Sequence, residues 1–444
     1  MRVYLKMKFF KTHHLHKKYL NKDLPKLNDM SSSGYGNKVP YNDYIKEFIF
    51  NDVFVKDNFL TFITKKQVDG VDTEQIDDID FYLKIDGQKK YIKKESLKII
   101  ITSTKTERVV QYKIPSRPLT TIELVLNYRE NKLLYDLSDK FFYFKNLPKG
   151  QVVVNTIFWN NWSWVKNWIE YNIELGVDHF FLYYTGVMDN KTIYESLEKY
   201  IHNKKVTLFE WNFPIGHGHE SWNPYEAYAQ HSQKAHSLFL SKNKFEKFMC
   251  MDPDEYLILA GIYRNDLSLF LEEIGGYDFL LLQGLWFEAI NPPLPWKETA
   301  DIVEEELPHH SRNNIRKYYD SWKDTEACIS TPVKGEHIKN NSWLNIKNIS
   351  NPNLDVSSRL HGIDSRSISE HTTKWVSYEK CFYLHFTNFT KKHRQMYHKW
   401  SDEKNIRHQK IDTPLLEDWY GLNFNQIKQK YIEKGFNHET NNPI

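Results

Sequence analysis

The strongest constraint on the fold is an alternation of strand-like and helix-like segments that begins at Val152. Apolar runs typical of buried strands alternate with segments of helical character, in the order 152–158, 164–176, 179–184, 192–202, 206–211, 225–242 and 245–251. In the first helix-like segment the apolar residues recur at helical spacing, and Gly176 supplies a stop. This alternation predicts an α/β domain with a mostly parallel, Rossmann-like sheet covered by helices on both faces.

An acidic cluster follows the last of these strands. Asp252, Asp254 and Glu255 come directly after the apolar run Phe248–Met251. Carboxylates this close repel one another unless a cation compensates them. Asp252 and Asp254 lie two positions apart, so in an extended segment they point the same way and suit a hard divalent ion. The end of an α/β strand is also where such folds bind ligands. The alternative is a solvated acidic turn.

Length and composition bound the class of protein. A chain of 444 residues, with 40% hydrophobic and 15% aromatic residues, is globular and long enough for two domains. The net charge is only +3, which weighs against a nucleic-acid partner. The widely separated cysteines fit buried thiols in a reducing compartment. Because no apolar run approaches the ~20 residues that span a bilayer, we expect no transmembrane segment and a soluble, cytoplasmic protein.

Changes in composition divide the chain into four parts. Residues 1–40 form a basic, flexible lead-in, and residues 41–148 are rich in strand-forming residues separated by turn signals. The second part predicts a smaller all-β, sandwich-like domain, whose last strand is Phe141–Phe144. It carries no cluster of acids, His or Cys, so we expect a support or docking role. Residues 149–410 form the α/β domain, with further strands over 279–287, 327–333, 343–346 and 380–386, and residues 411–444 form a C-terminal helix and tail.

Several motifs recur in the order of a known family. They are the strand–helix run Asn160–Tyr171, the strand Leu175–Tyr183, the acidic motif within Phe248–Leu257, and the segments Leu285–Phe287, His361–Gly362 and Leu384–Phe386. Over roughly residues 152–400 the chain resembles a glycosyltransferase of GT-A type, more narrowly the family-92 (DUF23-like) group and its family-2-like relatives. The resemblance implies a GT-A catalytic domain.

The resemblance also implies an activity and a cofactor. A sugar would pass from a nucleotide-sugar donor, with a UDP-sugar favoured, to an acceptor hydroxyl on a glycan or glycoprotein. Mn²⁺ or Mg²⁺ would compensate the charge of the departing diphosphate. Asp254 is then expected as a direct metal ligand, with Asp252 on the metal or near the ribose. His385 is expected as a third ligand, although a core position is the alternative for a His on an apolar strand. Glu255 would orient a bound water or point to the edge of the core.

Donor contacts and a catalytic base complete the expected site. The residues expected to contact the donor are Thr156, Asn160, Tyr184, Asp252, His361 and Lys391. An inverting enzyme needs a carboxylate that accepts the proton of the acceptor hydroxyl, whereas a retaining enzyme does not. Glu288 and Asp364 are candidates for this base by position.

Departures from the family pattern keep other functions open. Asn161 stands where the group usually has Glu, and Tyr184 stands where the second strand usually ends in Asp. These departures give some weight to a second hypothesis, a carbohydrate-binding or scaffold protein built on a degenerate transferase domain. A third hypothesis is a metal-dependent phosphoesterase or nuclease. It is disfavoured because the sequence lacks the wealth of His and Asp typical of two-metal sites.

Overall fold

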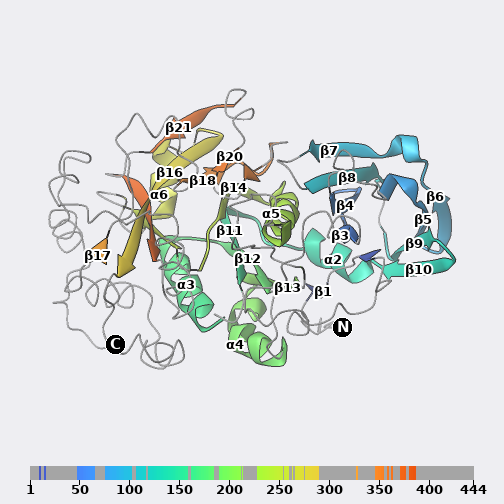
Figure 1. Ribbon diagram of the computed structural model, residues 1–444, viewed down its shortest axis with the longest axis horizontal. Helices are drawn as coiled ribbons and strands as arrows, with labels where there is room; N and C mark the ends of the chain where they lie inside the picture. The colour runs from blue at the N-terminus through green and yellow to red at the C-terminus, as the bar shows by residue number, and fades with distance from the viewer. Residues whose placement is uncertain are drawn as a thin grey trace, which may run out of the picture. The chain divides into compact units, whose positions relative to one another are not determined.

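The structure is a computed structural model that combines helices with sheets, as the sequence predicts for a mixed α/β protein (Figure 1). It describes residues 10–11, 15–16, 48–65, 76–102, 107–116, 119–158, 162–184, 190–211, 213, 228–253, 255–259, 263, 266–274, 276–289, 327–328, 346–354, 358–359, 362–363, 371–376 and 380–386. The chain divides into two units. The first comprises Met1–Asn160, His179–Phe248 and Asn351–Glu370, and the second comprises Asn161–Asp178, Met249–Ser350 and His371–Ile444.

Antiparallel strands form two sheets in the N-terminal part of the first unit. The five-stranded sheet has the order β2 (Leu15–His16), β3 (Phe48–Lys56), β4 (Phe59–Lys65), β8 (Glu107–Lys113), β7 (Lys98–Thr102). The four-stranded sheet has the order β10 (Asn131–Asp136), β9 (Ile122–Tyr128), β5 (Asp80–Ile85), β6 (Gln88–Tyr91). Single 3-10 turns lie at Ile76–Asp78 and Lys94–Ser96. A separate small pair is formed by β19 (Ser358–Arg359) and β20 (Gly362–Ile363).

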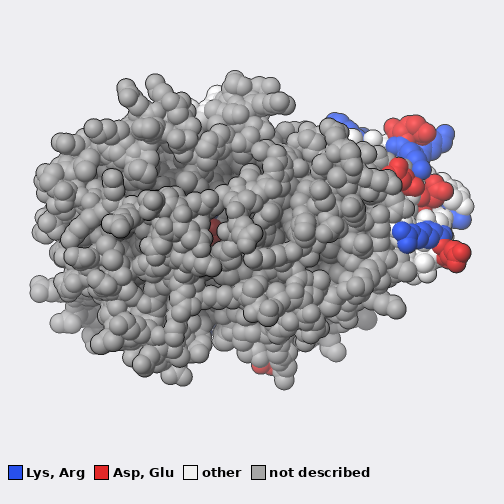
Figure 2. All heavy atoms as spheres, in the orientation of Figure 1, with Lys and Arg blue, Asp and Glu red and all other residues white. Residues whose placement is uncertain are grey.

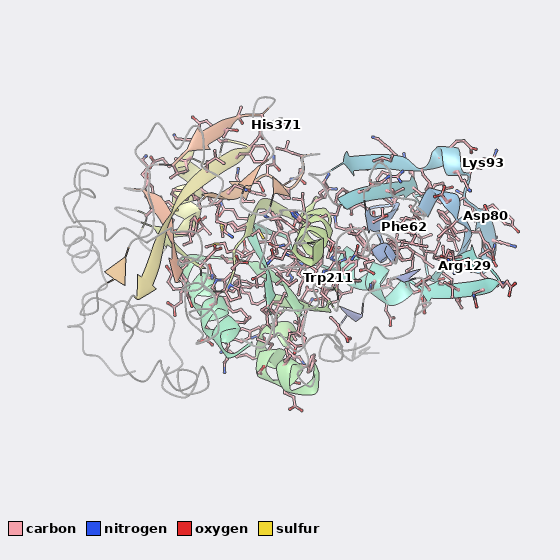
Figure 3. The ribbon with its side chains drawn as sticks, in the orientation of Figure 1. Phe62, Asp80, Lys93, Arg129, Trp211 and His371 are labelled. Atoms are coloured by element: carbon pink, nitrogen blue, oxygen red, sulfur yellow. The ribbon has the colours of Figure 1, made fainter. Side chains whose placement is uncertain are left out.

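The two sheets share one hydrophobic core. Phe62 of β4 meets Phe81 of β5 with ring centroids 5.4 Å apart, and Phe50 of β3 meets Tyr135 of β10 at 5.8 Å. Figure 3 shows Phe62 inside this part of the unit, whereas Lys93, Asp80 and Arg129 lie at its outer end. On the coloured part of the surface in Figure 2, basic and acidic side chains are interspersed.

The segment predicted as the last strand of this region is a helix instead. Residues Ser138–Lys145 form α2, so the prediction of a strand over Phe141–Phe144 is wrong. Consecutive aromatic residues favour strands, but tertiary packing overrides that preference here. Phe141 and Phe144 lie three positions apart on one helical face, and their side chains are only 7% and 0% exposed. The Ser138 hydroxyl also accepts a hydrogen bond from the Ile122 amide at 3.0 Å, which fixes the start of the helix.

Parallel strands of the first unit follow the predicted alternation. Their order is β1 (Phe10–Lys11), β13 (Val206–Glu210), β12 (His179–Tyr184), β11 (Gly150–Phe158), β14 (Phe245–Cys250). Pairing is parallel from β1 to β11. Helix α4 (Asn190–His202) packs against β13, and helix α5 (Tyr228–Ser241) packs against β11.

Helix α5 is buried on all sides although it is rich in polar residues. Every residue from His231 to Ser241 is buried. One face contacts β11, and other faces contact β3, β4 and β8 of the five-stranded sheet. Figure 1 shows α5 between these two groups of strands. The N-terminal β-rich part therefore covers the face of α5 that an ordinary surface helix would expose to water.

A buried charged network joins α5 to the β-rich part. Lys140 Nζ of α2 lies 2.8 Å from Asp52 Oδ1, and His236 Nε2 of α5 lies 3.1 Å from Asp52 Oδ2. The hydroxyl of Tyr183 lies 2.6 Å from His236 Nδ1. Burial lowers the pKa of His236, so the ring is neutral. Because a carboxylate only accepts, the ring proton belongs on Nε2, and Tyr183 donates to Nδ1.

A second buried network uses His179 of β12. Its Nδ1 lies 2.8 Å from the Lys204 carbonyl, and its Nε2 lies 2.8 Å from the Thr207 hydroxyl, which in turn lies 2.9 Å from the Tyr143 hydroxyl of α2. A carbonyl only accepts, so Nδ1 carries the proton and Nε2 accepts from Thr207. Burial lowers the pKa of His179 to about 4.

The second unit has a more mixed sheet. Its strands have the order β18 (Ile346–Ser350), β16 (Phe279–Ala289), β22 (Cys381–Phe386), β15 (Glu255–Leu259). β16 pairs antiparallel with β18 and parallel with β22, and β22 pairs antiparallel with β15. Strands β17 (Ala327–Cys328) and β21 (Thr373–Trp375) also pair with β16. The described part of this sheet is therefore not mostly parallel, in contrast to the strands of the first unit.

In the described part of the second unit, the helices are α3 (Trp162–Leu175) and α6 (Leu267–Ile274). Gly176 ends α3, as its sequence predicts, with a φ of 108° that favours glycine. The Gly176 amide donates to the Ile173 carbonyl at 3.0 Å, and the Val177 amide donates to the Asn172 carbonyl at 2.9 Å. This pair of bonds is a Schellman motif, which satisfies carbonyls at the end of the helix. None of the described helices is long and apolar enough to cross a membrane.

Candidate active site around the acidic turn

The acidic motif forms a tight turn between β14 and β15. The Glu255 amide donates to the Asp252 carbonyl at 2.9 Å. The Asp252 amide donates to Glu255 Oε2 at 2.8 Å. The two residues thus close the turn from both ends, in the reciprocal manner of a helix capping box. Asp254, the expected direct metal ligand, lies between these two residues in the sequence and is outside the described residues.

A buried lysine compensates the acidic turn from within the chain. Lys347 Nζ of β18 lies 2.8 Å from Glu255 Oε2 and 3.3 Å from Asp252 Oδ2. The side chain of Lys347 is 5% exposed and that of Glu255 is 2% exposed. Burial opposes the charge on Lys347, but Asp252 and Glu255 hold the pKa of its ammonium well above the ordinary value. The ammonium is therefore a fixed positive charge.

The two carboxylates have different environments. The side chain of Asp252 is 39% exposed, whereas that of Glu255 is buried and satisfied by Lys347 and the Asp252 amide. Asp252 can therefore meet a ligand, and Glu255 is committed to the turn. Of the two expectations for Glu255, the burial of its side chain agrees with a position at the edge of the core and not with the binding of a water.

Helix α3 holds the strand that leaves the turn. Trp168 Nε1 donates to the Glu255 carbonyl at 2.8 Å, and the Tyr171 hydroxyl donates to the Leu257 carbonyl at 2.5 Å. Carbonyls two residues apart point to the same edge of a strand, and residues three apart share a helical face. The Tyr171 ring also packs edge-on against Tyr256, with centroids 5.2 Å apart. The Trp and Tyr of the helical motif therefore act as anchors for β15.

Strand register brings two other expected site residues to the same sheet. The Cα of His385 in β22 pairs with Glu255 of β15 on one side and with Trp286 of β16 on the other. This register places the backbone of the expected third metal ligand beside the acidic turn. Glu288, a candidate base, pairs with Cys328 of β17. The other candidate base, Asp364, lies outside the described residues.

Two of the expected donor contacts, Thr156 and Tyr184, are buried in the first unit. The Thr156 side chain in β11 is 1% exposed, and Tyr184 in β12 is fully buried with its ring 5.4 Å from that of Phe158. Both residues lie near the C-terminal ends of parallel strands, where α/β sheets bind ligands. Asn160, His361 and Lys391 lie outside the described residues, so their roles stay predictions.

The side chains in place fit a divalent cation in part. Asp252 offers an exposed carboxylate at the end of a strand, which is the oxygen donor that Mn²⁺ and Mg²⁺ prefer. Within the described ranges no group of three His, Cys, Asp or Glu side chains could hold a metal ion. A full ligand set would need side chains that the structure does not describe, and those of Asp254 and His385 are the expected ones.

Sequence reasoning missed Lys347. The sequence predicts a strand over 343–346, which ends one position before Lys347, whereas β18 spans Ile346–Ser350. Its partner Glu255 is far away in the sequence, and only the pairing of β18 within the sheet defines the contact. The motif suggested a need for a cation, and the chain itself supplies one.

Comparison with known proteins identifies the family. The model of glycosyltransferase family 92 matches residues 151–414. Comparison with curated proteins gives no match. A solved structure of S. aureus TarS, residues 1–349, is similar with 13% sequence identity and a TM-score of 0.26, and the match covers 66% of this chain and 75% of that one. That TM-score is too low to support any conclusion. The family match covers more than half of the chain, and the protein belongs to glycosyltransferase family 92.

Proposed function

We propose that this glycosyltransferase is metal-dependent and moves a hexose from a nucleotide-sugar, preferably a UDP-sugar, to an acceptor hydroxyl on a glycan or glycoprotein. The observation that carries the proposal is the exposed carboxylate of Asp252 on a turn that is held rigidly at the end of β14. Family membership supplies the reaction class. The Asp252 carboxylate supports metal dependence, because divalent ions prefer oxygen ligands.

Asp252, Asp254 and His385 are the residues that would hold the ion. When bound, Mn²⁺ or Mg²⁺ supplies positive charge against the departing nucleoside diphosphate. Glu255 and Lys347 keep the turn in one conformation, so that little reorganisation accompanies donor binding. Trp168 and Tyr171 hold the following strand in register. Glu288 or Asp364 would take the acceptor proton in an inverting reaction.

A binding assay tests the proposal directly. The melting temperature is measured with Mn²⁺, with a panel of UDP- and GDP-sugars, and with both together. We expect an increase only when the metal and one class of nucleotide-sugar are both present, because ligands that bind the native state raise its stability. Asp254→Asn should abolish the increase, and Asp252→Asn should reduce it.

A matched control separates charge from position. Glu130→Gln removes an exposed carboxylate from the turn between β9 and β10 and should leave the increase unchanged. If no nucleotide-sugar raises the melting temperature with or without metal, the transferase proposal fails, and the carbohydrate-binding alternative gains support. An equal increase with and without Mn²⁺ would refute metal dependence alone.

A further inference from the structure

Lys347 is more than a packing residue of β18. Building on the function proposed above, we propose that Lys347 is a positioning residue that fixes the acidic turn and sets the net charge of the cation site. It would act through Asp252 and Glu255, without touching the donor itself.

The geometry gives Lys347 a hold on both ends of the turn. Its ammonium lies 2.8 Å from Glu255 Oε2 and 3.3 Å from Asp252 Oδ2. The same Glu255 oxygen accepts the Asp252 amide at 2.8 Å. One cation therefore joins the residue that opens the turn to the residue that closes it. In the sequence, Asp254 lies between these two residues.

The charge balance follows from the same contacts. Glu255 and Lys347 are both almost fully buried and neutralise each other. The ammonium also contacts Asp252 at 3.3 Å, and Asp252 and Asp254 are the carboxylates expected to meet a divalent ion. Without the lysine, the motif would carry one more negative charge and would attract a divalent ion more strongly. The Lys347 ammonium therefore lowers the affinity of the site for a metal ion, and it also holds the turn in place before the ion binds.

This role predicts opposite effects on binding and on turnover. In Lys347→Met, Mn²⁺ should bind on the order of tenfold tighter, because a positive charge beside Asp252 is lost. The turnover number should fall on the order of a hundredfold, because the turn loses its fixed position. A purely structural lysine would not tighten metal binding when removed. Mn²⁺ affinity is measured by electron paramagnetic resonance, which requires no catalysis.

Two further variants complete the test. Lys347→Met/Glu255→Gln removes the charge pair but leaves an amide oxygen for the Asp252 amide. We expect wild-type Mn²⁺ affinity within about threefold and partial recovery of turnover, since the net charge is restored. Lys374→Met removes a lysine of β21 that lies over the ring of Tyr277 and should change neither quantity.

Hydrogen exchange of the peptide spanning 252–257 tests whether Lys347 fixes the turn, separately from its effect on the charge of the cation site. Lys347→Met should speed exchange of the Asp252 and Glu255 amides, and the double variant should restore their protection.

The proposal is overturned if a folded Lys347→Met protein keeps its Mn²⁺ affinity and its exchange rates within twofold of wild type. If Lys347→Met does not fold, a tenfold change of Mn²⁺ affinity in the double variant overturns it instead. If the wild-type protein binds no Mn²⁺ and transfers no sugar, while Lys347→Met still speeds local exchange, the proposed function fails and the hold of Lys347 on the turn is established.

Discussion

Removal of Lys140 should destabilise the first unit far more than removal of an exposed lysine. In Lys140→Met the carboxylate of Asp52, which is 0% exposed, loses the cation at 2.8 Å, and the nearby His236 ring is neutral. Breaking a buried ion pair by deleting one partner costs about 3–5 kcal/mol, because the remaining charge is buried without compensation. We expect a loss of this size in the free energy of unfolding.

The double variant tests the physical cause. Asp52→Asn/Lys140→Met removes both charges, and Asn at position 52 retains an oxygen for the Val53 amide, which donates to Asp52 at 2.9 Å in the native protein. Replacement of a buried ion pair by neutral groups of similar size is often close to neutral for stability. The double variant should therefore recover most of the stability that the single variant loses, and the coupling energy of the cycle should exceed about 2 kcal/mol.

A second cycle in the same region serves as the matched control. Lys84 and Glu123 form an ion pair of 3.0 Å whose side chains are 37% and 34% exposed. Solvent screens such a pair, so its coupling energy should stay below about 1 kcal/mol. Urea denaturation, followed by far-ultraviolet circular dichroism and by tryptophan fluorescence, measures both cycles. Equal coupling energies for the two pairs, or a cost below 1 kcal/mol for Lys140→Met, would refute the assignment of a buried charged network.

Three further predictions follow from the first unit and from the anchors of β15. A chain reduced to residues 149–444, close to the span of the family match, should be insoluble or unfolded, because α5 loses the sheet that covers it; a cooperative melting transition of this fragment would contradict this. The free energy of unfolding should fall by about 3 kcal/mol as the pH falls from about 6.5 to about 4, because His179 is protonated in the unfolded chain but not in the folded protein. His179→Phe should flatten this dependence of the urea midpoint on pH. The control variant His202→Gln, which replaces an exposed histidine, should not. Trp168→Phe should cost about 1–3 kcal/mol and lower turnover, because a carbonyl of β15 loses its donor; unchanged exchange of the β15 amides would show that the indole bond does not hold the strand.

Local patterns in the sequence determined the order of elements from Val152 to Cys250. Continuous apolar runs and helical spacing each depend on residues a few positions apart, so the sequence alone predicts β11, α3, β12, α4, β13, α5 and β14. Gly176 as the end of α3 followed for the same reason. The acidic motif was also visible as a local cluster at the end of a strand, and the family match supports the reaction class that it suggested.

Tertiary contacts decided the features that local patterns could not. The run Phe141–Phe144 has strand-forming residues but folds as a helix, because two of its rings pack on one face against the strands. The β-rich part had no chemical motif, yet its sheet covers the buried helix α5. Lys347 meets Glu255 only in the folded chain, because the strand order brings β18 to the acidic turn that follows β14. The sequence thus determined where the acidic motif lies and which elements lead to it. Only the folded chain decided that Glu255 is bound to an internal lysine while Asp252 stays exposed, because burial and pairing of charges depend on residues that are distant along the chain.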